Sequence, residues 1–151
     1  MPNSLVGCWS LRAWQRTSED GSASYPLGEH PSGLLVYTAD GLMAVQLTAL
    51  QRPVIKVSDP LNGGSVNQRA AAYSTCLAYY GTYKVHDTNV VVHTIEGSLF
   101  PDWTGQQQPR PFTVEGDTLT LHTPTMHLPT GDVTNALIWT RREGQTTPNH
   151  C

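Results

Sequence analysis

Two ionisable side chains, His93 and Glu96, lie within Val90–Phe100, the most apolar strand-like stretch of the chain. In a strand with simple alternation, His93 shares a face with Val91 and Ile95, whereas Glu96 points to the opposite face. Either one of the two side chains therefore faces solvent, or a β-bulge near Glu96 changes the alternation. Burying a polar group costs stability unless the group is paired, and proteins retain perturbed groups where chemistry uses them. We expect His93 or Glu96 to act as a general acid or base in a dry cavity, with a hydrogen-bonded structural pair as the alternative.

Phenol hydroxyls are the second group that could take part in chemistry, because the chain has six tyrosines and only two phenylalanines. Tyr79 and Tyr83 would share one face of a strand, a pattern that suits a cavity wall with hydroxyls pointing at a ligand. Aromatic packing between strands is the alternative. We expect Tyr79 as a candidate catalytic group, and we expect His93 or Glu96 to face the cavity within hydrogen-bond reach of a tyrosine hydroxyl or of the bound ligand. The tyrosines expected to contact a ligand are Tyr25, Tyr37 and Tyr83.

Several other large or charged side chains are candidates for ligand binding. Trp14 could line the mouth of a cavity or cover its outer wall, and Trp103 lies in a loop where it could act as a lid or anchor the loop. Arg110 could neutralise an anionic group on a ligand, or it could pair with Glu96 or Asp102. The candidate ligand contacts beside the tyrosines are Trp14, Met43, Trp103 and Arg110.

No metal or cofactor site is expected from the sequence. His122 and His127 are five residues apart across a proline, and the cysteines Cys8, Cys76 and Cys151 include no C-x-x-C pair. Zinc would need three or four convergent ligands. The chain also lacks the glycine-rich motifs that bind nucleotides and the Gly-x-Ser-x-Gly motif of serine hydrolases. We expect neither a cofactor nor a metal.

The composition limits the partners of the chain. Only 14% of the 151 residues are charged, the formal net charge is −3, and the nine basic residues are scattered along the chain, so nucleic acid is not an expected partner. No apolar run approaches the length of a membrane span, so no membrane partner is expected. The segment 1–7 has neither a basic region nor an apolar core, so we expect no signal peptide and a cytoplasmic location.

The elements that would position these side chains are β-strands. Short runs rich in tyrosine, threonine and valine alternate with turn signals such as Asp40-Gly41, which favour an all-β meander. About eight antiparallel strands avoid exposed edges by closing into a barrel, whose interior can be filled or can hold one small ligand. One short helix is expected at Val66–Tyr73. The expected strands are Val6–Thr17, Gly33–Thr38, Gly41–Leu50, Leu77–Val85, Asn89–Phe100, Phe112–Val114, Thr118–Thr123 and Val133–Arg142.

An ordered series of segments resembles the small single-domain lipocalin-like family. Near the N-terminus, Gly7-Cys8-Trp9 carries the Gly-x-Trp signature that opens the lipocalins. The resemblance covers most of the chain, from about Leu5 to Arg141, although the glycine-rich segment Pro53–Ser74 departs from the pattern. The further segments that carry it are Tyr25–Gly28, Gly33–Leu47, Ala78–Tyr83, His93–Gly105, Arg110 and Trp139–Arg141.

This resemblance implies a calycin-type, up-and-down antiparallel barrel around a central cavity for an apolar small molecule. In the families that it resembles, the tryptophan at the position of Trp9 plugs the closed end of the barrel, and a C-terminal arginine lies across it. Arg141 is the candidate for that arginine. Some barrels of lipocalin-like type occur in natural-product pathways, where they cyclise or isomerise a hydrophobic intermediate.

Three functions are therefore considered for a barrel domain over residues 1–142, followed by a polar tail over residues 143–151. The first is a cofactor-free isomerase or cyclase of secondary-metabolite biosynthesis, acting on a hydrophobic intermediate held in the cavity. The second is a non-catalytic carrier of an apolar small molecule, and the third is a dimerising structural protein with a filled interior. A homodimer is compatible with each of them. We favour the enzyme because His93 and Glu96 interrupt an apolar strand.

Overall fold

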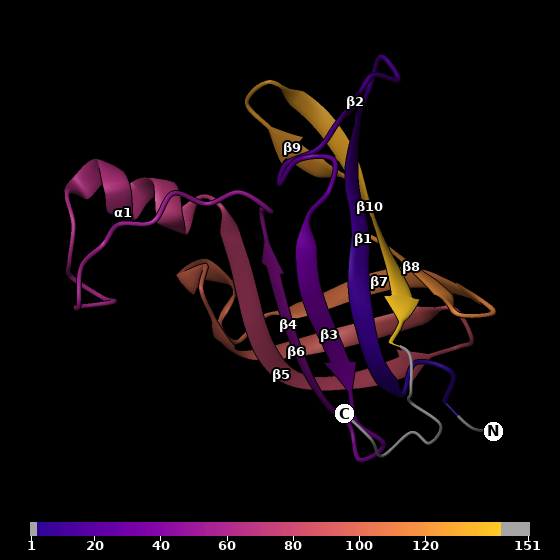
Figure 1. The fold of residues 1–151 in the computed structure, drawn as a ribbon. Coiled ribbons are helices and arrows are strands. Elements are labelled where there is room, and N and C mark those ends of the chain that lie inside the picture. Colours follow the sequence, from indigo (N-terminus) through magenta and orange to yellow (C-terminus); the bar gives the residue numbers. More distant parts are fainter. Residues whose placement is uncertain (1–2, 143–151) are drawn as a thin grey trace.

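The computed structural model describes residues 3–142, and the expected polar tail 143–151 lies outside the described residues. Within this range, each long strand pairs antiparallel with the next, and β1 also pairs with β10, which closes the sheet into a barrel (Figure 1). This confirms the all-β antiparallel barrel predicted from the sequence. The long strands are β1 (Gly7–Ser18), β3 (Ser32–Tyr37), β4 (Leu42–Thr48), β5 (Cys76–His86), β6 (Val90–Ser98), β7 (Gln107–Glu115), β8 (Thr118–His122) and β10 (Gly131–Arg141).

The predicted strand bounds lie within two residues of the observed ones, except at the start of β7, and the structure adds three small elements. Two short strands, β2 (Ala23–Ser24) and β9 (Met126–Leu128), extend the edges of β1 and β10, and a 3-10 turn, η1, covers Pro101–Trp103. The strand β7 begins five residues before Phe112, the predicted start. This first part contains two prolines, which lack a backbone N–H and are unfavourable in strands, so the sequence pattern did not predict it as a strand. The helix α1 (Val66–Tyr73) has the predicted bounds.

The closed end of the barrel is built around Trp9. Its ring is fully buried, its Nε1 donates to the carbonyl oxygen of Leu5 at 2.9 Å, and the guanidinium of Arg141 lies 4.2 Å from the ring centroid. The Arg141 side chain also donates to the carbonyl oxygens of Val6 and Ser4. The stacking of Arg141 on Trp9 is therefore confirmed, and the arginine ties the first residues of the chain to the last strand.

Two bulges change the side-chain alternation of the barrel wall. In β1, the register with β10 shifts at Arg12, so that Trp14 points inward although it has the opposite phase from Trp9. In β6, the register with β5 shifts between Ile95 and Gly97, and Glu96 is the extra residue. The bulge in β1 thus brings Trp14 into the interior. Glu96 is exposed because simple alternation from the inward-facing His93 and Ile95 already points it outward. The bulge in β6 changes the register only from Gly97 onward.

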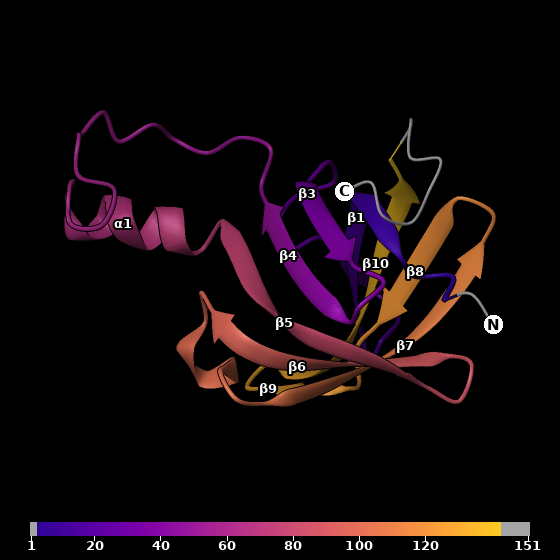
Figure 2. The ribbon, with the colours of Figure 1, turned by 90° about the horizontal axis from the view of Figure 1, so that it is seen from below.

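The connection between β4 and β5 projects away from the barrel. It contains α1, none of whose residues is buried, and it leaves and rejoins the barrel at the end where β4 stops and β5 begins (Figure 2). This connection includes the segment Pro53–Ser74, which departs from the family pattern. Within residues 3–142, no helix is both long and apolar enough to cross a membrane.

Candidate functional site

The barrel interior contains a cavity of about 290 Å³. A cavity of this size is at the lower end of the range of small-molecule sites, and it contradicts the filled interior that a purely structural barrel would have. The polar side chains of the wall include His93, Tyr79, Gln108, Arg110 and Asn135. Its apolar wall includes Leu35, Leu47, Leu77, Leu121, Leu137 and Trp139.

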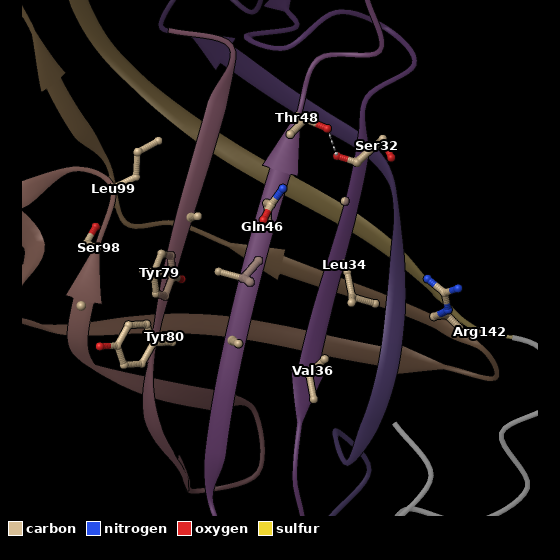
Figure 3. A pocket seen from close by; sticks show the side chains of 15 residues that line it. Ser32, Leu34, Val36, Gln46, Thr48, Tyr79, Tyr80, Ser98, Leu99 and Arg142 are labelled. Carbon is tan, nitrogen blue, oxygen red and sulfur yellow. Dashed lines mark hydrogen bonds between the residues drawn. The ribbon is translucent and has the colours of Figure 1, made fainter. Parts of the chain in front are cut away.

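A larger concavity, of about 810 Å³, lies on the outside of the barrel, over β3, β4 and β5. Figure 3 shows that its floor carries the side chains of Leu34, Val36, Gln46 and Tyr80, which come from neighbouring strands. Leu34 and Tyr80 are exposed, and the one formal charge of this lining belongs to the exposed Arg142. Because the buried histidine and the buried arginine of the described residues, His93 and Arg110, both line the internal cavity, we take it as the candidate site.

His93 is held between two tyrosine hydroxyls at the wall of the cavity. Its ring is buried, with 1% of the residue exposed, and Tyr37 and Tyr79 come from two other strands, β3 and β5. The hydroxyl of Tyr37 lies 2.6 Å from His93 Nε2, and that of Tyr79 lies 2.8 Å from His93 Nδ1. His93 and Tyr79 line the cavity, whereas Tyr37 is fully buried behind them.

Tyr37, His93 and Tyr79 form a chain of hydrogen bonds, and Tyr37 determines which atom donates at each step. Its buried hydroxyl makes no hydrogen bond within the described residues other than that with His93 Nε2. Since a buried donor left without an acceptor is costly, we assign Tyr37 as the donor to Nε2. A neutral imidazole then carries its proton on Nδ1 and donates it to Tyr79. The hydroxyl proton of Tyr79 is left free to point into the cavity.

The protonation states of these groups follow from their burial. Burial lowers the pKa of His93 from 6.5 to about 3, and the nearby charge of Arg110 lowers it further in the same direction. Burial also raises the pKa of Tyr79. The Arg110 guanidinium opposes this rise, because its positive charge and its hydrogen bond to Tyr79 both lower the pKa. The pKa of Tyr37 is raised well above its usual value, also by burial. At neutral pH, His93 is therefore an uncharged imidazole and both phenols keep their protons.

Acid should destabilise the protein through His93. The unfolded chain binds a proton at His93 near pH 6.5, whereas the folded chain does so only near pH 3. As the pH falls between these values, the free energy of unfolding should decrease by about 1.4 kcal/mol per pH unit from this group. The free energies of unfolding of wild type and His93→Gln can be measured with urea at several pH values between about 7 and 4. The contribution of His93 is the difference between the two proteins in how steeply this free energy changes with pH. Identical slopes would contradict the neutral, buried His93.

Arg110 is held beside the tyrosine–histidine chain by neutral acceptors. The residue is 8% exposed, its Nη1 donates to the carbonyl oxygen of Pro109 at 3.0 Å, and its Nη2 donates to Gln108 Oε1 at 2.7 Å. The side-chain amide of Gln108 donates in turn to Gln106 Oε1. Within residues 3–142, no carboxylate lies within 4.0 Å of this guanidinium, so the pairing with Glu96 or Asp102 that the sequence allows is absent.

Trp14 and Trp103, the two candidate tryptophans of the sequence analysis, both line the cavity, as Trp139 does. Trp14 donates from Nε1 to Asn135 Oδ1 at 2.9 Å, and Asn135 donates from Nδ2 to Thr123 Oγ1. Trp103 packs edge-on against Tyr79, with 5.7 Å between the ring centroids. Trp14 thus takes the alternative in which it lines the cavity. Trp103 borders the cavity and also packs edge-on against Phe100, so both the lid and the anchor of the loop stay open.

The structure does not bring all candidate residues together. Glu96 is exposed and lies on the outer wall, so it cannot meet a ligand in the cavity. Tyr25 is 40% exposed and outside the cavity lining. Met43 and Tyr83 are buried in the core rather than along the cavity, and the Tyr83 hydroxyl donates to the carbonyl oxygen of Thr38. Glu96 is outward because it alternates with the inward-facing His93 and Ile95. Tyr25 lies outside the strands, and Tyr83 packs against Tyr37.

The sequence reasoning missed other polar and apolar residues of the cavity. Asn135 is 3% exposed and interrupts the inward face of β10 between Val133 and Leu137, so the signal that singled out His93 could have found it. Gln108 could not be recognised as a cavity residue because the residues around it were not predicted to form a strand. Within the described part of the chain, no three histidine, cysteine, aspartate or glutamate side chains gather where they could hold a metal ion.

Comparisons with known proteins add the following. The model of the family described as a lipocalin-like domain matches residues 6–142. No curated protein matches the sequence significantly. Among solved structures, a redesigned β-barrel is similar with a TM-score of 0.40 and 15% sequence identity, over 92% of this chain and 92% of that chain. The range matched by the family model contains every residue that lines the cavity, and a barrel with such a cavity fits the binding of a small molecule.

Proposed function

Because the chain belongs to the family of lipocalin-like domains, we propose that it binds a small apolar molecule in the barrel cavity and isomerises or cyclises it without a cofactor. The observation that carries the proposal is the neutral His93 held between Tyr37 and Tyr79, with the Tyr79 hydroxyl proton left free at the cavity wall. A cavity that served only for storage would need no buried ionisable chain. The substrate class that fits is a hydrophobic natural-product intermediate.

Tyr79 is the catalytic residue of this proposal, because its hydroxyl borders the space that the substrate fills. It donates its proton to one position of the substrate, and the resulting phenolate accepts a hydrogen bond from His93 Nδ1. The charge of Arg110 favours the same phenolate, since it acts to lower the pKa of Tyr79. The phenolate then removes a proton from another position of the substrate. The proton count is unchanged, as an isomerisation or cyclisation requires.

His93 is a positioning residue in this scheme. Its ring is fixed by Tyr37 at Nε2, so that Nδ1 presents its proton to Tyr79. His93 and Tyr79 are buried, which strengthens the hydrogen bond between them, and the mainly apolar wall would hold the substrate close to the phenol.

A carrier of an apolar ligand is the second candidate function. It is favoured by the fact that both nitrogens of His93 already have partners, so the imidazole could serve only to hold the wall of the barrel together. The two functions share the same cavity and differ in whether the bound molecule is changed.

Binding in the cavity can be tested with N-phenyl-1-naphthylamine, a neutral apolar dye that fluoresces when it leaves water. We expect saturable binding, weakened at least about tenfold by Leu77→Trp, since the larger ring occupies space in the cavity wall. Leu34→Trp is the matched control, because Leu34 lies in the outer groove. Weakening by Leu34→Trp alone would move the binding site to the outside of the barrel.

Catalysis can be separated from carriage by incubating the protein with an apolar extract of its source cells. An isomerase or cyclase should produce a compound of unchanged mass and new chromatographic retention, detected by liquid chromatography and mass spectrometry. A carrier should release its ligand unaltered. Extract without protein, and extract with the Leu77→Trp variant, serve as controls for spontaneous conversion.

A further inference from the structure

The cavity wall contains one buried charge without a counter-ion, and we infer that the natural ligand is an organic anion whose negatively charged oxygen pairs with Arg110. Arg110 is 8% exposed. Among the described residues that line the cavity, it is the one side chain that carries a charge at neutral pH, since His93 is uncharged. The inference rests on the proposed binding function and names the class of ligand: an apolar skeleton with a single carboxylate-like or enolate-like group.

The hydrogen-bond partners of the Arg110 guanidinium in the described chain are all neutral. The guanidinium has five N–H groups, and the oxygens that it reaches are the Pro109 carbonyl, the Gln108 amide and the Tyr79 hydroxyl. Neutral acceptors orient the guanidinium but do not compensate its charge. A buried cation without an anion is costly, so a site that keeps one has a use for its charge.

No group of the described chain supplies the missing anion. The carboxylates of Glu96 and Asp102, which the sequence offers as partners, belong to exposed residues and make no ion pair with Arg110. Tyr79 keeps its proton at neutral pH because burial raises its pKa, and His93 is uncharged or cationic and never an anion. The counter-ion must therefore enter with the ligand.

The groups beside Arg110 suit an anionic oxygen as well. The free Tyr79 hydroxyl proton is a hydrogen-bond donor, and Arg110 lies close enough to Tyr79 to affect its ionisation. Two donors, one of them charged, therefore border the same region of the cavity. The rest of the wall is mainly leucine and aromatic rings, which fit an apolar skeleton.

Two dyes with the same aromatic skeleton test the inference directly. 1-Anilinonaphthalene-8-sulfonate carries a sulfonate, which stands in for the anionic group, and N-phenyl-1-naphthylamine lacks it. We expect wild type to bind the sulfonate dye at least about tenfold more tightly than the neutral dye. Arg110→Met should remove this preference by weakening the sulfonate dye at least about tenfold, while the neutral dye changes by less than about threefold. Arg110→Lys should retain part of the preference.

Arg12→Met is the matched control, because Arg12 is an exposed cation on the outside of β1 and its loss should leave both affinities unchanged. Equal affinities of wild type for the two dyes would overturn the anion inference without any variant and leave cavity binding intact. Equal weakening of both dyes by Arg110→Met would show that Arg110 only supports the wall. If neither dye binds, the proposed binding function fails, and the inference fails with it.

Discussion

Replacing Trp9 by alanine is expected to lower the free energy of unfolding by about 3–5 kcal/mol, the usual cost of deleting a large buried aromatic ring. The ring is fully buried at the closed end of the barrel, and its removal also deletes the bond to Leu5 and the surface on which Arg141 stacks. Leu5 and Arg141 connect the first and last parts of the barrel, so closure between β1 and β10 should weaken. Urea unfolding followed by circular dichroism measures the loss.

Trp103→Ala is the matched control for this prediction. It makes the same chemical change in a half-buried ring on η1, so it should cost less stability while affecting the cavity more directly. A Trp9→Ala variant that unfolds like wild type and loses only its ligand would contradict the structural role of Trp9. The comparison therefore separates the plug of the barrel from the wall of the site.

Sequence patterns predict the barrel because local alternation and turn residues determine most strands. The helix α1 and the barrel strands, except β7, follow from runs that are bounded by glycine, proline or aspartate. The strand β7 is the informative exception. Pro109 and Pro111 lower its strand propensity, yet they pair with Val92 and Val90 of β6, and the closure of the barrel compensates for the missing N–H groups.

The inward or outward direction of the candidate side chains could be predicted only as far as simple alternation holds. His93 keeps the phase of Val91 and Ile95 and is buried with them, as that alternation requires. Trp14 lies beyond the bulge at Arg12, so its direction depends on a register shift that no local sequence signal marks. The sequence left Trp14 between two directions for this physical reason.

The partners of Arg110 could not be predicted because they depend on which strands become neighbours. Sequence separation allows a salt bridge with Glu96 or Asp102, but Glu96 points to the outer face of β6, opposite to His93, and Asp102 is exposed. Gln108, two residues before Arg110 on the same face of β7, reaches it instead. The same dependence applies to the Tyr37–His93–Tyr79 chain, whose three members are contributed by β3, β6 and β5.

His93→Asn is expected to slow the conversion detected in the cell extract by about 10²–10⁴-fold, the usual contribution of a positioned acid–base group. Asparagine has a donor and an acceptor but cannot span the distance between Tyr37 and Tyr79, which lie 2.6 Å and 2.8 Å from opposite nitrogens of the imidazole. The Tyr79 phenolate would then lose the donor that stabilises it. Binding of N-phenyl-1-naphthylamine should change little, because the apolar wall remains, so the loss should appear in the rate of conversion and not in dye affinity.

Glu96→Gln is the matched control on the same strand, three residues away and exposed, and it should leave the rate within about twofold of wild type. Tyr79→Phe should reproduce the loss seen in His93→Asn, since both variants remove the same proton path. If Tyr79→Phe abolishes conversion while His93→Asn does not, Tyr79 acts without help from His93. A rate that falls only in Glu96→Gln would place the chemistry on the outer wall. Unchanged conversion in all three variants would mean that the barrel acts on its substrate by shape alone, because no proton then passes through these groups.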